Sequence, residues 1–105
     1  MYPIILSKSI TSELNTKLDG VVADWDGSEV NGRKYEDLMD RIWEHSKTSC
    51  REPFMVNAWD AEAIADELEN SASALKDNGY TTTARTFMTK AEELRKLVDD
   101  GIIPN

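Results

Sequence analysis

The chain has 105 residues, and its 20 Asp and Glu side chains outnumber its 12 Lys and Arg side chains, which gives a formal net charge of −8. This charge disfavours direct binding to nucleic acid and to anionic membranes, because both depend on clusters of Lys and Arg. The length fits one domain, residues 1–105, and the single cysteine, Cys50, excludes an intramolecular disulfide. No apolar run near the start is long enough for a signal peptide or a membrane span, so we expect a cytosolic protein.

The first half of the chain is expected to form two helices. Apolar residues recur every three or four positions over 9–26, which predicts a helix with Ser9 as its N-cap and the following Asp-Gly pair as its stop. A second helix is predicted over 29–46, with a charged outer side and a continuous apolar stripe. The stripe consists of Tyr35, Leu38, Met39, Ile42 and Trp43. We expect a loop over 47–56, and the alternating segment 2–6 is too short and solitary to build a sheet.

A third helix is predicted over 58–77, and its N-terminus offers two capping arrangements. Asn57 as N-cap would place Asp60 at the third helical position, where its charge favours the helix dipole. Asp60 as N-cap would instead make Trp59 and Ile64 a hydrophobic staple around the first turn. The inner face of this helix is expected to consist of Ala61, Ile64, Ala65, Leu68, Ala72 and Leu75.

A fourth helix is predicted over 81–99, with Thr81 or Thr82 as its N-cap and Gly101 at its end. Its apolar stripe consists of Tyr80, Ala84, Phe87, Ala91, Leu94 and Val98. Because only a short break around Asn-Gly separates it from the third helix, the two are expected to be antiparallel neighbours in an αα-hairpin. The predicted fold class is therefore all-α, a small bundle of about four helices with a C-terminal αα-hairpin.

Candidate catalytic and metal-binding residues are sparse. His45 is the only histidine, and neither it nor Cys50 lies in a sequence context typical of a catalytic thiol or imidazole. We expect His45 in the last turn of the second helix, where the dipole favours a cation, and Cys50 in a loop or the core. Two such ligands are too few for structural zinc, and segment 24–35 begins like a calcium loop but lacks the turn glycine and the bidentate Glu. We therefore expect no enzymatic activity, no cofactor and no metal.

The negative charge is distributed unevenly along the chain. Residues 13–46 hold nine acidic and four basic side chains and residues 57–78 hold six acidic and one basic, so each segment has a net charge of −5. Residues 79–105 hold four of each sign and are balanced. In the second and third helices the acidic residues recur at spacings of three and four, which places them on the outer side of each helix. These candidate partner-binding residues are Asp37, Asp40, Glu44, Glu62, Asp66 and Glu69.

The chain contains three tryptophans, a residue enriched both in cores and at binding hot spots. Trp25 and Trp43 lie on the apolar stripes, so we expect both in the core. Trp59 has two candidate environments. If the third helix begins before it, Trp59 projects on the acidic outer side and becomes a partner-binding anchor, whereas in the staple arrangement it folds back onto the helix.

Two segments of the predicted hairpin, 60–68 (DAEAIADEL) and 84–94 (ARTFMTKAEEL), resemble segments of small proteins encoded by phages and mobile elements. With its length and acidity, the chain is similar in style to the anti-CRISPR inhibitors of bacterial defence. The resemblance implies a non-enzymatic inhibitor in the host cytosol that covers a basic, nucleic-acid-binding surface of a host protein or ribonucleoprotein complex.

Two other functions fit the same acidity. An immunity protein or antitoxin would neutralise a basic nuclease or toxin through the same helix faces. A small structural or assembly protein would use its charge for solubility alone, and a homo-oligomer with an apolar interface would favour that function.

Overall fold

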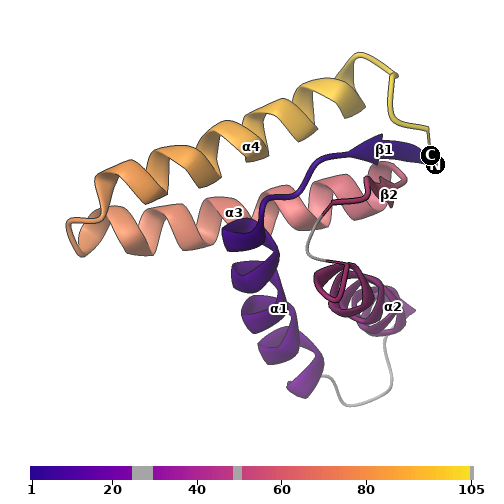
Figure 1. Ribbon diagram of the computed structural model, residues 1–105, viewed down its shortest axis with the longest axis horizontal. Helices are drawn as coiled ribbons and strands as arrows, with labels where there is room; N and C mark the ends of the chain where they lie inside the picture. Colours follow the sequence, from indigo (N-terminus) through magenta and orange to yellow (C-terminus); the bar gives the residue numbers. More distant parts are fainter. Residues whose placement is uncertain (25–29, 49–50, 105) are drawn as a thin grey trace. The chain divides into compact units, whose positions relative to one another are not determined.

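The computed structural model describes residues 1–24, 30–48 and 51–104. Within these residues the elements follow in the order β1 (Tyr2–Ile4), α1 (Lys8–Ala23), α2 (Val30–Ser46), β2 (Phe54–Val56), α3 (Ala58–Asp77) and α4 (Thr81–Asp99) (Figure 1). The predicted small all-α bundle is thus confirmed. By its internal contacts the chain divides into unit 1, which comprises Met1–Ile4 and Met55–Asn105, and unit 2, which comprises Ile5–Phe54. The expectation of a single domain over 1–105 stays a prediction.

Unit 1 is built on the hairpin of α3 and α4, which lie side by side and antiparallel, with the bounds predicted from the sequence (Figure 1). α3 begins at a capping box. Asn57 Oδ1 accepts a hydrogen bond from the Asp60 backbone N–H at 2.8 Å, and Asp60 Oδ2 accepts one from the Asn57 N–H at 3.2 Å. Of the two predicted arrangements, the Asn57 cap forms. Trp59 therefore occupies the second helical position and not the position before the N-cap that a staple requires.

Both helices of the hairpin end at a glycine in the left-handed conformation. At the end of α3, the Tyr80 N–H donates to the Leu75 carbonyl at 2.8 Å and the Gly79 N–H donates to the Lys76 carbonyl at 3.1 Å, with a φ of 87° at Gly79. The same pair of bonds closes α4, with a φ of 74° at Gly101. These are Schellman motifs, which glycine adopts without steric cost, so both predicted stops are confirmed.

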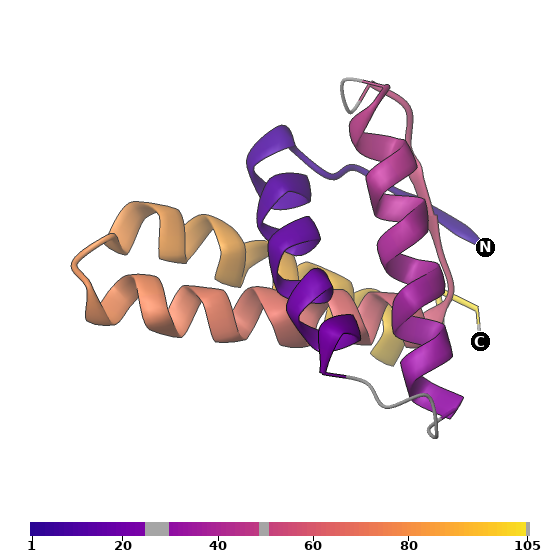
Figure 2. The same ribbon diagram turned by 90° about the horizontal axis from the view of Figure 1, so that it is seen from below.

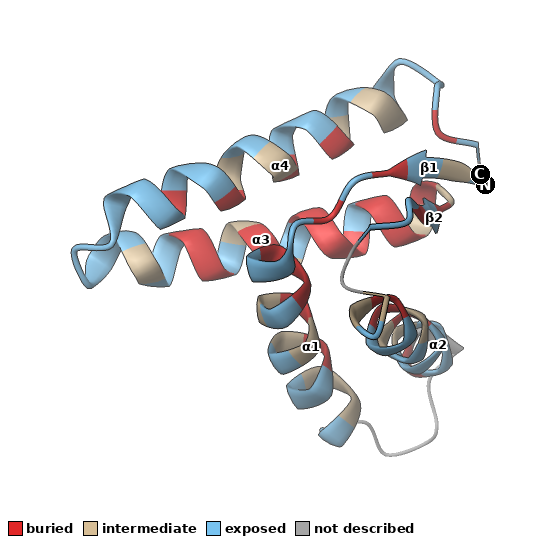
Figure 3. Ribbon diagram, in the orientation of Figure 1, coloured by how far each residue is buried: buried red, intermediate tan, exposed pale blue. Residues whose placement is uncertain are grey.

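The predicted inner faces of the hairpin are largely confirmed, and the buried residues of α3 and α4 lie on facing sides (Figure 3). Buried side chains of the predicted faces are Ala61, Ile64, Ala65, Leu68 and Ala72 in α3 and Ala84, Phe87, Ala91 and Leu94 in α4. Tyr80 is instead 62% exposed, because it is the N-cap of α4 and lies at the tip of the hairpin. Thr81 and Thr82, each predicted as the cap, lie inside the helix, and the Tyr80 side chain makes no capping hydrogen bond.

A small sheet corrects two predictions, because β1 lies in the segment expected to be solitary and β2 lies in the expected loop over 47–56. The two strands pair with each other, and Ile4 and Val56 are buried. Each strand has three residues, which is too short for an alternating pattern to stand out from the sequence.

Unit 2 holds α1 and α2, which lie side by side and run antiparallel (Figure 2). The predicted N-cap of α1 is wrong, since Ser7 and not Ser9 accepts the hydrogen bond from Ile10 N, at 3.3 Å. The apolar repeat that sets this helix starts at the fully buried Leu6, one turn before Ile10, so the earlier serine stands at the helix boundary. α1 ends at Ala23, short of the predicted end at 26; the expected Asp-Gly stop and Trp25 lie outside the described residues.

Candidate functional site

The outer face of α2 presents acidic side chains, as the sequence predicts. Asp37, Asp40 and Glu44 are exposed, and Glu36, which the sequence analysis did not single out, is exposed beside them one turn before Asp40. No ion-pair partner of Glu36 or Asp40 lies among the described residues. Within the described part of the chain, no internal cation neutralises these two carboxylates.

The other two carboxylates are paired within the helix or at its end. Asp37 Oδ2 accepts a hydrogen bond from Arg41 Nε at 2.9 Å, and Glu44 Oε1 accepts one from Lys47 Nζ at 3.2 Å. Pairs of this exposed, local kind contribute only a few tenths of a kcal/mol. A partner's Lys or Arg can therefore replace the internal cation at little cost.

Trp43 lies on the same face and is 56% exposed, so the expectation that it belongs to the core is wrong. Asp40 and Lys47 lie one helical turn before and after it, and Lys47 Nζ is 5.6 Å from the centre of the indole ring. An exposed indole among carboxylates offers both apolar contact area and charge. We call the set Glu36, Asp37, Asp40, Trp43 and Glu44 the α2 acidic face.

The position of Trp43 follows from where α2 buries its side chains. Leu38 and Ile42 are fully buried and His45 is 7% exposed, and these three residues, spaced by four and three, share one side of the helix. Trp43 is rotated about 100° from Ile42, toward the outer side. The apolar stripe in the sequence is wider than the buried side, on which Leu38 lies between Ile42 and His45 around the helix axis.

The acidic stripe of α3 is partly neutralised by α4. Arg95 Nε donates to Glu69 Oε1 at 2.7 Å, and Arg95 Nη2 donates to Glu69 Oε2 at 3.2 Å and also to Asp66. The hydrogen bonds with Glu69, and then with Asp66, raise the pKa of Arg95, so the guanidinium stays charged. Glu62 is the one predicted α3 carboxylate with no ion-pair partner among the described residues. One of the four cations of residues 79–105, Arg95, thus neutralises carboxylates of α3.

Trp59 is half-buried at the second position of α3. The helix begins before it, so it lies on the side of Glu62 and Asp66, as one of its two predicted environments requires. Of the two tryptophans in the described residues, Trp43 is the more exposed. The stronger candidate for an aromatic anchor is therefore on α2.

His45 lies in the last turn of α2, as predicted, and packs against an aromatic ring. Its ring centre is 5.5 Å from that of Phe54 at an interplanar angle of 65°, and the Arg41 guanidinium carbon is 5.7 Å from the same Phe54 ring. His45 Nε2 is buried without a hydrogen-bond partner among the described residues. His45 thus belongs to the packing around Phe54, whereas Cys50 lies outside the described residues.

The described part of the chain holds neither a cluster of metal ligands nor a helix suited to crossing a membrane. Among residues 1–24, 30–48 and 51–104, no three His, Cys, Asp or Glu side chains are placed to hold a metal ion. Residues 25–29 of the calcium-like segment are not described. None of the described helices combines the length and the apolar character needed to cross a bilayer.

Comparison of the chain with protein-family models, curated proteins and solved structures finds no match. The resemblance to anti-CRISPR proteins, based on the two hairpin segments and on acidity, stays a prediction.

Proposed function

We propose that the chain is a non-enzymatic inhibitor of the anti-CRISPR kind, encoded by a phage or mobile element, that covers a basic nucleic-acid-binding surface of a defence complex in the host cytosol. The observation that carries the proposal is the α2 acidic face, on which the exposed Trp43 shares one side of the helix with exposed carboxylates. Basic surfaces attract such a face, and an aromatic anchor at its centre is typical of binding hot spots.

The two kinds of side chain have different tasks in this proposal. Glu36 and Asp40, which have no ion-pair partner in the described part of the chain, and the net charge of −8 accelerate the encounter with a basic surface, because opposite charges steer association. Trp43 slows dissociation, because burying an indole removes a large apolar area from water. Competition with nucleic acid follows, since both ligands require the same Lys and Arg side chains of the partner.

The α3 stripe has a secondary role. Asp66 and Glu69 are held by Arg95, and these three groups together have a net charge of −1. This cluster therefore attracts an external partner only weakly. Glu62 is the exposed carboxylate of the stripe that remains to contact a partner. The partner is therefore expected to lie against α2.

The test compares two matched substitutions, Asp40→Lys on α2 and Glu62→Lys on α3. Both carboxylates are exposed and have no ion-pair partner among the described residues, so the change in net charge is the same. The tagged wild-type protein should capture from host cytosol a basic complex that added nucleic acid displaces. Asp40→Lys should weaken this capture about tenfold and Glu62→Lys by no more than about twofold. The purified complex should lose nucleic-acid binding when the wild-type protein is added.

Other outcomes overturn the proposal. Capture of a basic nuclease with toxin activity would assign the chain as an immunity protein or antitoxin. A homo-oligomer that captures nothing, or equal losses from Asp40→Lys and Glu62→Lys, would remove the role of the α2 acidic face.

A further inference from the structure

Unit 1 contains a groove that has no role in the proposed function. It lies between α3 and α4 and has a volume of about 540 Å³, within the range of sites that bind small molecules. Its lining combines apolar side chains with two cations, one from each helix. The groove is therefore amphipathic, and its chemistry constrains what it binds.

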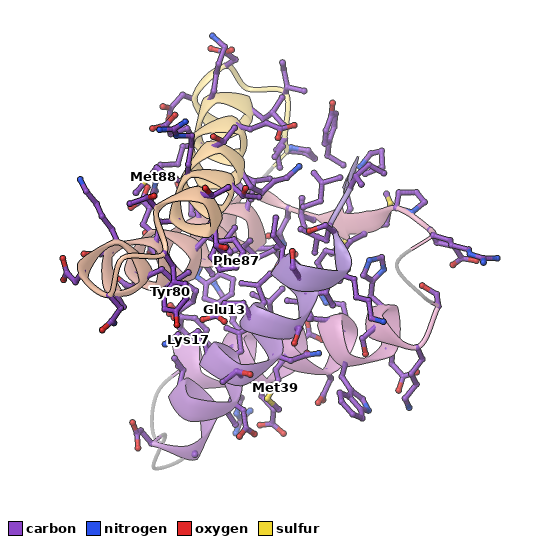
Figure 4. The ribbon with its side chains drawn as sticks, turned by 60° about the vertical axis from the view of Figure 1, so that its left-hand side comes forward. Glu13, Lys17, Met39, Tyr80, Phe87 and Met88 are labelled. Atoms are coloured by element: carbon purple, nitrogen blue, oxygen red, sulfur yellow. The ribbon has the colours of Figure 1, made fainter. Side chains whose placement is uncertain are left out.

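The apolar part of the groove is formed by Ala72, Ala84 and Met88. The two alanines are buried, and their small side chains leave space between the helices. Met88 is half-buried, and its flexible thioether adapts to the shape of a ligand. Phe87 and Met88 leave α4 in different directions, so Met88 lines the groove while the buried Phe87 does not (Figure 4).

The charged part of the groove is formed by Lys76 of α3 and Arg85 of α4. The other basic side chains of the hairpin are ion-paired: Lys90 with Glu93 at 3.0 Å, Lys96 with Asp100 at 3.7 Å, and Arg95 as described above. Lys76 and Arg85 have no ion-pair partner among the described residues. The two uncompensated cations of an acidic hairpin thus line the same groove.

We propose that this groove binds a small amphipathic monocarboxylate. The carboxylate lies between Lys76 and Arg85, at the end of the groove next to the α3–α4 turn, and the apolar body lies along Ala84 and Met88. Glu92 lines the groove further along α4 and disfavours a second negative charge there. The site is independent of the proposed inhibitory function, because none of its residues belongs to the α2 acidic face.

Three probes separate the contributions of charge and apolar body. Octanoate carries both, acetate carries the charge alone, and 1-octanol carries the apolar chain alone. In titrations followed by amide NMR signals, octanoate should produce saturable shifts at Ala72, Ala84 and Met88. Acetate and 1-octanol should each bind about tenfold more weakly or not at all, since each loses one of the two contributions.

Substitutions at the exposed cations identify the site without affecting the fold. The double variant Lys76→Gln, Arg85→Gln should weaken octanoate binding about tenfold and leave 1-octanol unchanged, because only the charge contribution is removed. The control Lys96→Gln removes a cation of α4 outside the groove and should bind octanoate as the wild type does. Equal binding of octanoate and 1-octanol, shifts outside the groove, or no loss in the double variant would overturn the proposal.

Discussion

Helices α2 and α3 carry acidic stripes of the same spacing, yet the two stripes have different surroundings. On α2, Glu36 and Asp40 have no ion-pair partner among the described residues and lie beside an exposed indole. On α3, Asp66 and Glu69 bind Arg95 of the neighbouring helix. The surroundings of a carboxylate stripe therefore depend on the helix packed beside it, which the spacing alone does not specify.

The comparison also separates two uses of charge. The ion pairs on α2 are local and exposed, so they stabilise the helix weakly and can be exchanged. Arg95 is 26 positions from Glu69 and 29 positions from Asp66 in the sequence, so this cluster connects α4 to α3. Charge on α2 is thus directed outward, and charge on α3 contributes to the hairpin.

The largest expected effect comes from Trp43→Ala. Removal of this anchor should weaken binding to the captured partner by about 2 kcal/mol or more, roughly 30-fold in Kd, as for other hot-spot tryptophans. Because Trp43 is largely exposed, the free energy of unfolding in urea should change by only about 0.5 kcal/mol. The control Trp59→Ala should show the reverse, a greater loss of stability than of affinity. A larger loss of affinity from Trp59→Ala than from Trp43→Ala would identify Trp59, on α3, as the anchor.

A smaller effect is expected on the rate of association. Asp40→Lys should slow binding to the same partner about tenfold at low salt, whereas Glu62→Lys should slow it about twofold, because steering is strongest near the contact. Stopped-flow measurements check both rates. The difference should disappear at about 1 M salt, where screening shortens the range of exposed charges to about 3 Å. A difference that persists at high salt would show that charge steering is not its cause.

Arg95→Met should lower the free energy of unfolding by about 1 kcal/mol, because it leaves two carboxylates without their cation on the hairpin. The control Lys96→Met breaks an exposed pair with Asp100 and should change stability by less than about 0.5 kcal/mol. Urea unfolding of both variants provides the measurement. Equal losses would mean that the Arg95 cluster is no stronger than a surface pair.

The smallest expected effect is one of pH. Because the hydrogen bonds with Glu69 and Asp66 raise the pKa of Arg95, its stabilising contribution is complete below the unfolded value and is lost only as pH rises through the folded one. An unfolded arginine already titrates above about pH 12. The stability difference between wild type and Arg95→Met should therefore stay constant from about pH 7 to pH 10. A decline over that range would contradict a raised pKa.

The helical hairpin could be predicted from the sequence because its signals are local. Apolar residues at spacings of three and four, the Asn57 cap and the glycines at 79 and 101 each act within one or two helical turns. The pairing of β1 with β2 could not be predicted. A strand of three residues is too short to show an alternating pattern, and about 50 residues separate the two strands in the sequence. The core position predicted for Trp43 is wrong because its neighbours on the stripe are apolar, and the spacing alone does not show where the buried side of α2 ends.

The Arg95 cluster could be predicted only in part from the sequence. In an antiparallel hairpin, residues equally distant from the turn lie side by side, and Arg95 is as far after Gly79 as Ala63 is before it. Glu62 is the acidic residue nearest to that position, and Asp60 and Asp66 each lie three residues from it, so the register of the hairpin indicates a cross-helix ion pair. The choice of Asp66 and Glu69 over Glu62 required the packed structure.

The composition of unit 1 has a consequence for synthesis on the ribosome. β1 is made first, but its partner β2 ends at Val56, and the C-terminal segment is fastened to the start of α3 by a 2.8 Å hydrogen bond from the Ala58 N–H to the Pro104 carbonyl. Unit 2 ends at Phe54, the first residue of β2, so nearly all of unit 2 is synthesised before β2 is complete. β1 can therefore pair with β2 only after residues 8–46, which form α1 and α2, have been synthesised, and the hydrogen bond between Ala58 and Pro104 forms later still.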